Sequence, residues 1–223
     1  MNRPAPDEAA APRRRRGRPP GSGTEQGAAA RERIIRAAVE LFSEKGFHGT
    51  GVGDIGARAG IQRGALYYHI RSKEELLWEV LRRYTEEALE GAESIAGTDA
   101  DAVEKLRLLI RHHVRIIADH RDEVAIQQRD ADALTGERAV ELQALRDRVQ
   151  AVWQGILDEG YRTGRFRTAD HVITNGLLGM VNLVYLWYRP GQGDTPETIA
   201  EKFLSVLSGG LLTGPEAERR DAM

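Results

Sequence analysis

A short segment with the sequence GIQRGALYYHIR groups side chains that can contact a polyanion. The hydroxyls of Tyr67 and Tyr68 and the ring of His69 can donate hydrogen bonds to phosphate oxygens. Arg63 can donate twice to guanine O6 and N7, and Gln62 pairs in a similar way with adenine. These residue types indicate recognition of a nucleic acid. The chain has no nucleophile elbow, metal-ligand cluster or supported cofactor loop, so we do not expect an enzyme.

The charge distribution also favours a nucleic acid at the N-terminal end. The net charge of the whole chain is −2, but residues 1–20 carry +4, residues 21–75 carry +1 and the remainder carries −7. Between Gly46 and Lys73 the only acidic residue is Asp54. The basic residues of this segment are Arg58, Arg63, Arg71 and Lys73. We therefore expect the N-terminal end to approach a polyanion.

Two short helices are expected to position these side chains. Apolar residues at spacings of three and four predict one helix over residues 52–59 and another over residues 63–70. Gly60 lies between them and can adopt the positive φ of a tight turn. The apolar positions are Val52, Ile55, Ala59, Leu66 and Ile70. Two short helices joined in this way form a helix-turn-helix, whose second helix fits the DNA major groove.

The rest of the chain predicts further helices and no strand, so the expected fold class is all-α. These helices cover residues 28–46, 73–93, 101–119, 123–133, 137–162, 169–188 and 196–212. Ser72, with Glu75 three residues later, matches a capping box before the second of them. We divide the chain into a disordered basic arm (1–26), a three-helix DNA-binding domain with the helix-turn-helix (27–75), a helical ligand-binding and dimerisation domain (76–213) and a disordered tail (214–223).

The run GTGVGDIGARAGIQRGALYYHIRSKEELLWEVL resembles the DNA-binding motif of the TetR family of one-component bacterial regulators. The resemblance covers about residues 31–81 and includes spaced Ala-Gly, Gly-x-Leu-Tyr, His and Ser-Lys-Glu elements. It implies that Tyr67, His69 and Lys73 contact phosphates, and that Thr50 caps the first short helix and meets another phosphate. The expected DNA-binding residues of this domain are Thr50, Gln62, Arg63, Gly64, Ala65, Tyr67, Tyr68, His69 and Lys73.

Three glycines depart from the family pattern in the first short helix. Gly51, Gly53 and Gly56 stand where longer residues are common, and each interior glycine weakens a helix by about 1 kcal/mol. We therefore expect this helix to be loosely held. The same glycines spell G-x-G-x-x-G, but no predicted strand precedes them, so a dinucleotide site is not expected.

The N-terminal arm contains RRRRGRPPG, which resembles an AT-hook. In that interpretation Arg15, Arg16 and Arg18 enter the narrow minor groove of A·T-rich DNA. The alternative is a basic tail that touches phosphates without reading sequence.

Polar residues set among apolar ones are candidates to line a ligand pocket between the later helices. They are His113, Gln127, Asn175, Asn182 and Tyr185, with Trp153 as an apolar wall. His113 and His120 share a helix face, but the spacing places no third ligand, so we expect neither a metal site nor a cofactor.

The stretch LDEGYRTGRFRTADHVITNGLLGMVNLVYLWYRPG resembles the TetR subgroup that represses fatty-acid and steroid breakdown. This resemblance implies an acyl-CoA thioester as effector. Four arginines could meet the phosphates of coenzyme A or could be plain surface charges: Arg162, Arg165, Arg167 and Arg189. Residues 169–188 and 196–212 are so apolar that a second copy is expected to cover them, which predicts a homodimer.

We therefore expect a cytoplasmic transcriptional regulator without a membrane segment. It would be a dimeric repressor that binds double-stranded DNA at a palindromic operator and leaves it when a small-molecule effector binds. The alternative is an architectural DNA-binding protein that uses the basic arm with little sequence specificity.

Overall fold

The computed structural model describes residues 22–211, and these residues form helices joined by short loops. In chain order they are α1 (Ser22–Gly49), α2 (Val52–Ala59), α3 (Arg63–His69), α4 (Lys73–Ala96), α5 (Ala102–Asp119), α6 (Arg121–Asp130), the 3-10 turn η1 (Ala131–Ala133), α7 (Gly136–Arg162), α8 (His171–Asn182), α9 (Val184–Trp187) and α10 (Pro196–Leu211). No strand occurs within residues 22–211, so the all-α prediction is confirmed. The three arginines of the AT-hook-like segment and the tail from residue 214 lie outside the described residues.

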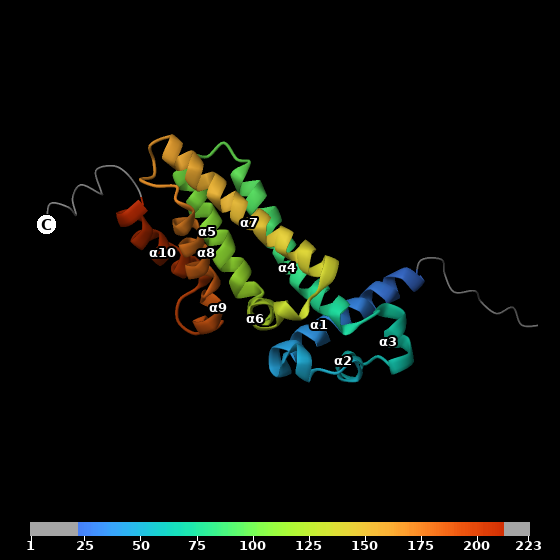
Figure 1. The fold of residues 1–223 in the computed structure, drawn as a ribbon. Coiled ribbons are helices and arrows are strands. Elements are labelled where there is room, and N and C mark those ends of the chain that lie inside the picture. Colours follow the sequence, from blue (N-terminus) through green and yellow to red (C-terminus); the bar gives the residue numbers. More distant parts are fainter. Residues whose placement is uncertain (1–21, 212–223) are drawn as a thin grey trace, which may run out of the picture.

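The helices form two connected groups (Figure 1). α1, α2 and α3 lie together at one end of the molecule, and α4 runs from them into a larger bundle. In that bundle α4, α5 and α7 pack on one another, and α8 and α10 pack on α5. None of the helices within residues 22–211 has the length and apolar character needed to cross a membrane.

α1 is longer than the sequence predicted. It begins at Ser22, before the expected start at Ala28, because the residues before Ala28 include good helix formers such as Glu25 and Gln26. The expected end at Gly46 is a kink, where φ is 79°, and helical turns continue to Gly49. The positive φ explains why a glycine stands at this position.

α2 and α3 form the expected helix-turn-helix, and the structure shows where two of the three glycines near α2 are needed. Gly60 ends α2 with a φ of 66°. Gly51 is the N-cap and is therefore not inside the helix. Gly56 is buried, and a Cβ there would lie 3.1 Å from the Ile61 carbonyl oxygen and 3.2 Å from Leu66 Cδ2. The missing side chain at Gly56 therefore lets α2 pack closely on α3.

α4 begins where the sequence placed it and packs tightly against α5. The Ser72 hydroxyl accepts a hydrogen bond from the Glu75 backbone N–H at 3.1 Å, which confirms the predicted cap. Further along α4, the imidazole of His112 from α5 fills the space above Gly91. His112 Nε2 lies 3.1 Å from the Ala88 carbonyl oxygen, so the ring is held in place.

Two of the predicted helices are divided in the structure. The helix expected over residues 169–188 is α8 and α9, because the backbone tightens at Leu183, where ψ is −5° and the carbonyl accepts from the Leu186 N–H at 3.1 Å. α8 begins at His171, since the Asp170 carboxylate accepts from the Val172 N–H at 2.8 Å. The helix expected over residues 123–133 is α6 followed by the 3-10 turn η1.

Candidate nucleic-acid interface and ligand pocket

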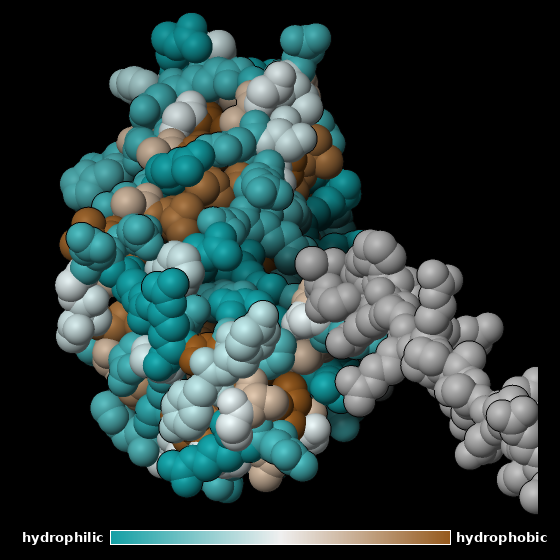
Figure 2. All heavy atoms as spheres, turned by 90° about the vertical axis from the view of Figure 1, so that its right-hand side faces the viewer, coloured by the Kyte–Doolittle hydropathy of each residue, from teal (hydrophilic) through white to brown (hydrophobic). Residues whose placement is uncertain are grey.

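α3 presents aromatic and polar side chains to solvent on the face opposite its core residue. Leu66 is fully buried, whereas Tyr67 and Tyr68 have exposed fractions of 54% and 87%. The ring of Tyr68 stands edge-on to that of His69, with centroids 5.3 Å apart. Gln62, Arg63, Gly64 and Ala65 are also exposed, so the structure brings these seven predicted residues onto one short element. Figure 2 faces this end of the molecule, where hydrophilic side chains predominate.

The four basic residues near the turn are not equally available to a polyanion. Arg58 pairs with Glu40 at 2.8 Å and with Glu44 at 3.2 Å, so its charge is already balanced. The guanidinium groups of Arg63 and Arg71 are exposed and have no partner among residues 22–211. Within residues 22–211, Arg63, Arg71 and Lys73 therefore carry positive charge that no ion pair balances, and Arg63 and Arg71 are the more exposed.

Thr50 and Lys73 donate hydrogen bonds to backbone carbonyls around the end of α1, so part of their predicted roles is wrong. The Thr50 hydroxyl is buried and lies 2.8 Å from the Gly46 carbonyl oxygen, so it neither caps α2 nor reaches a phosphate. Lys73 Nζ donates to the carbonyl oxygens of Phe47 at 2.7 Å and Thr50 at 3.0 Å. The kinked end of a helix leaves carbonyl oxygens without partners, and these two side chains satisfy them. One N–H of Lys73 remains for a phosphate.

Arg31 was not identified from the sequence, yet it ties α3 to α1 and α4. Its guanidinium donates to the backbone carbonyl of His69 and to the carboxylate of Glu79, and it lies 3.3 Å from Glu75. Glu79 is almost completely buried and also lies 3.3 Å from Arg83. The contact joins residues far apart in the sequence, so no local pattern could have indicated it. It fixes the end of α3 relative to α4.

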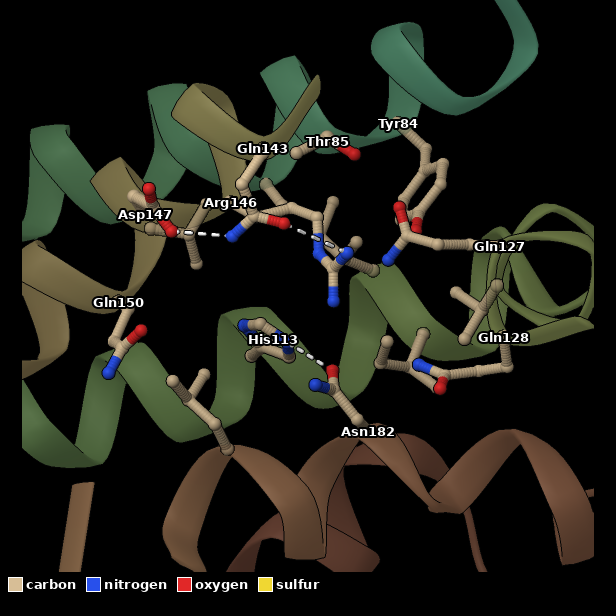
Figure 3. A pocket seen from close by; sticks show the side chains of 16 residues that line it. Tyr84, Thr85, His113, Gln127, Gln128, Gln143, Arg146, Asp147, Gln150 and Asn182 are labelled. Carbon is tan, nitrogen blue, oxygen red and sulfur yellow. Dashed lines mark hydrogen bonds between the residues drawn. The ribbon is translucent and has the colours of Figure 1, made fainter. Parts of the chain in front are cut away.

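A pocket with a volume of about 170 Å³ opens in the larger bundle between α4, α5, α6, α7 and α8. Figure 3 shows side chains from these helices pointing into it. Of the six predicted pocket residues, His113, Gln127 and Asn182 line it. Its other lining residues are Tyr84, Thr85, Ala88, Ile116, Ile117, Val124, Gln128, Gln143, Arg146, Asp147, Val149, Gln150 and Leu178.

The other three predicted pocket residues lie outside the lining. Trp153 is fully buried and stands edge-on behind His113, with ring centroids 5.5 Å apart, so it belongs to the core. Asn175 is exposed and accepts from Gln150 Nε2 at 2.7 Å. Tyr185 is half-buried on α9. Periodicity identified an apolar helix but not which of its faces points to the pocket.

The buried polar groups of the pocket are held neutral. His113 Nε2 lies 3.0 Å from Asn182 Oδ1, and burial lowers the pKa of the His113 imidazole to about 4. Burial also raises the pKa of the Tyr84 phenol. Arg146 reaches into the pocket from α7 (Figure 3), is exposed, and forms no ion pair within residues 22–211. The pocket therefore combines buried neutral polar groups with a mouth that carries the Arg146 cation and the Asp147 carboxylate.

The helix that carries Gln127 and Gln128 also contacts the end of α1. Asp130, at the end of α6, accepts from the Phe47 backbone N–H at 3.2 Å. Arg129 donates to the Phe42 carbonyl and pairs with Asp130 at 2.9 Å. The two glutamines lie within one helical turn of these contacts, so α6 links the pocket directly to the end of α1.

Exposed apolar side chains gather at the C-terminal part of the described chain. The exposed fractions are 51% for Leu183, 53% for Leu186, 52% for Trp187 and 72% for Val206. We call these four residues, which lie between α8 and α9, on α9 and on α10, the apolar face. Within residues 22–211 no three His, Asp or Glu side chains group closely enough to hold a metal ion.

Comparison with known proteins shows two family matches. The profile described as "Bacterial regulatory proteins, tetR family" matches residues 34–80, and "Tetracyclin repressor-like, C-terminal domain" matches residues 99–211. The HTH-type transcriptional repressor KstR2 of Rhodococcus jostii is 31% identical over 196 residues, which cover 86% of this chain and 96% of that protein.

Solved structures agree with these matches. The ketosteroid transcriptional regulator KstR2 of Mycobacterium tuberculosis has a TM-score of 0.77 and 27% identity, over 82% of this chain and 95% of that one. AibR in complex with isovaleryl coenzyme A and operator DNA has a TM-score of 0.71 and 26% identity, over 79% and 97%.

Proposed function

This chain belongs to the TetR family of bacterial regulatory proteins, and from that premise we propose that it is a dimeric transcriptional repressor that an acyl-CoA thioester releases from a palindromic operator. Such a repressor works in the cytoplasm, where it meets both DNA and thioester. The observation that carries the proposal is that α6 does two things. It lines the pocket, and it holds the end of α1 through Arg129 and Asp130.

The exposed face of α3 supports the DNA-binding part of the proposal. Arg63 begins the helix, has no partner in the described part of the chain, and would read a guanine. Tyr67, Tyr68 and Arg71 would contact the phosphates on either side. Lys73 would add its remaining N–H to a phosphate while it braces the end of α1.

The apolar face supports a homodimer. Its four side chains are large, and each is more than half exposed, which is costly unless a second copy covers them. A two-fold dimer would place two α3 helices about 34–36 Å apart on one side of the DNA. Replacing Trp187 with Asp should convert the dimer to monomers in sedimentation velocity, whereas unchanged sedimentation would exclude this face.

Two observations support an acyl-CoA thioester as effector. The structure of AibR, which is similar over most of its length, contains isovaleryl coenzyme A, and the pocket here has apolar side chains such as Ile117 in its lining and a cation reaching into it. Of the arginines considered for the coenzyme A phosphates, Arg165 pairs with Asp101 at 3.2 Å and Arg189 donates to two backbone carbonyls. Arg146 is the better candidate, because it lies at the pocket itself.

Release from DNA would follow from differential binding. An effector that fits the pocket better after α6 has moved would favour the arrangement in which Asp130 and Arg129 draw the end of α1 away. The Arg31 contact with α4 and the His69 carbonyl would carry this displacement to α3. Neither the relatives nor the described residues support the architectural alternative, since its basic arm lies outside them.

The proposal is tested by fluorescence anisotropy of the full chain on DNA from its own upstream region and on shuffled DNA, at two salt concentrations. Sequence-selective binding that a thioester reverses would support it. Selective binding that no thioester changes would remove the acyl-CoA class and keep the regulator. Equal binding to both DNAs would contradict the repressor.

A further inference from the structure

The pocket contains three buried polar atoms that have no hydrogen-bond partner within residues 22–211. They are Tyr84 Oη, His113 Nδ1 and Gln127 Oε1. All three residues line the same pocket, and Figure 3 shows their side chains pointing into it from α4, α5 and α6. A buried polar atom without a partner costs about 1–3 kcal/mol, so such atoms in a ligand pocket indicate what the ligand must supply.

Two of the three atoms can only accept a hydrogen bond. The Gln127 Oε1 atom is a carbonyl oxygen. His113 is neutral, and its Nε2 faces the Asn182 oxygen at 3.0 Å, so Nε2 carries the proton and Nδ1 is an acceptor. Tyr84 Oη can donate as well as accept. The buried part of the pocket is therefore short of donors.

The shortage of hydrogen-bond donors indicates which functional group on an acyl chain would fit the buried part of the pocket. A plain alkyl chain, an ether or a ketone has no proton to donate, and a carboxylate would place a negative charge beside two acceptors. A hydroxyl donates one hydrogen bond and accepts others, so it can serve Gln127 Oε1 and still receive a bond from a phenol such as that of Tyr84. A hydroxyl therefore matches these atoms best.

The amides of the coenzyme A arm are a poorer match for this position. That arm is attached to a charged nucleotide, which would remain at the open mouth near Arg146, Gln143 and Asp147. Tyr84 and His113 are each only 5% exposed, and apolar side chains such as Ile117 line the pocket with them. The acyl group is the part of a thioester suited to such surroundings.

We propose that the acyl group of the effector carries a hydroxyl that donates to Gln127 Oε1, so that the pocket selects a hydroxyacyl-CoA over the unsubstituted thioester. This inference rests on the proposed acyl-CoA function. It also gives the hydroxyl a role in release, because Gln127 is three residues before Asp130, which holds the end of α1.

The test is isothermal titration calorimetry of the full chain with octanoyl-CoA and with 3-, 5- and 8-hydroxyoctanoyl-CoA. One hydroxy isomer should bind about tenfold more tightly than octanoyl-CoA, as expected when a buried acceptor gains its donor. In Gln127→Met, which keeps the side-chain length and removes the acceptor, the difference should fall to about twofold or less. Gln192→Met is the matched control, since Gln192 is exposed in the loop after α9 and does not line the pocket, and it should keep the full difference.

The outcomes separate this inference from the function on which it rests. If octanoyl-CoA binds as tightly as every hydroxy isomer, or if the preference survives in Gln127→Met, the inference is overturned and an acyl-CoA effector stands. If no thioester binds, the proposed effector class fails.

A probe without coenzyme A tests the pocket directly. In NMR spectra of the glutamine side-chain amides, with Gln127 assigned by its loss in Gln127→Met, cyclohexanol should shift the Gln127 signal and cyclohexanone should not. An equal response to both, or a response to neither, would overturn the inference.

Discussion

Acidification should destabilise this protein through His113 at the bottom of the pocket. Burial lowers the pKa of this imidazole from its ordinary value of 6.5 to about 4. Between these two values the unfolded chain binds a proton that the folded chain does not, so the free energy of unfolding decreases as the pH falls from about 6.5 towards 4. Below about pH 4 this contribution stops changing.

The size of the effect follows from the same two values. At 1.36 kcal/mol per pH unit, the loss of stability between pH 8 and pH 5 is about 2 kcal/mol from this residue alone. His120 acts in the opposite direction, because its hydrogen bond with Glu123 raises its pKa. A comparison with a variant at residue 113 is therefore needed to isolate the contribution of His113.

The assay is urea unfolding of wild type and His113→Phe at pH 5 and pH 8, followed by circular dichroism at one protein concentration. The variant loses the bond to Asn182, so it should be less stable at pH 8. Its further loss on going to pH 5 should be about 2 kcal/mol smaller than that of wild type. An identical pH dependence in both proteins would refute the burial of a neutral imidazole in the pocket.

Three further predictions concern packing, DNA reading and the link between the domains. Gly91→Ala would place a Cβ 2.2 Å from the held imidazole of α5 and should destabilise the fold by about 1–3 kcal/mol in thermal melts, whereas Gly155→Ala, with no atom within 4 Å, should be neutral or slightly stabilising. Arg63→Ala should relax base preference at one operator position by about 1–3 kcal/mol, and Arg71→Ala should weaken all sequences alike and lower the salt slope by about 1; equal loss of specificity from both would contradict these roles. Asp130→Ala should retain DNA binding but reduce the thioester-induced change in DNA affinity measured by anisotropy, and an unchanged response would exclude the α6 contact as the link.

The helices and the helix-turn-helix could be predicted from sequence because their determinants are local. Apolar spacing, the cap at Ser72 and the glycine turn at Gly60 each act within a few residues, and the structure contains all three. The exposure of the two tyrosines of α3 could be predicted in the same way. Because Leu66 faces the core, the tyrosines next to it along the helix point towards solvent.

Contacts between distant segments could not be predicted in this way. Arg31 binds a carbonyl 38 residues away, and Asp130 binds the backbone N–H of a residue 83 positions earlier. Thr50 was assigned to a phosphate from the family resemblance, but the kink at Gly46 gives its hydroxyl a carbonyl partner. Pocket residues were chosen by residue type, without knowledge of where each side chain points, so Trp153 was included as an apolar wall although it lies in the core.

The most direct test of the central claim is reciprocity between effector and operator. The affinity of the full chain for a thioester should be measured with and without operator DNA, and the affinity for operator DNA with and without the thioester. Because one equilibrium links the two sites, the account predicts that each ligand weakens the other by the same factor, about tenfold or more. Thioester binding of equal strength with and without operator DNA would contradict the account.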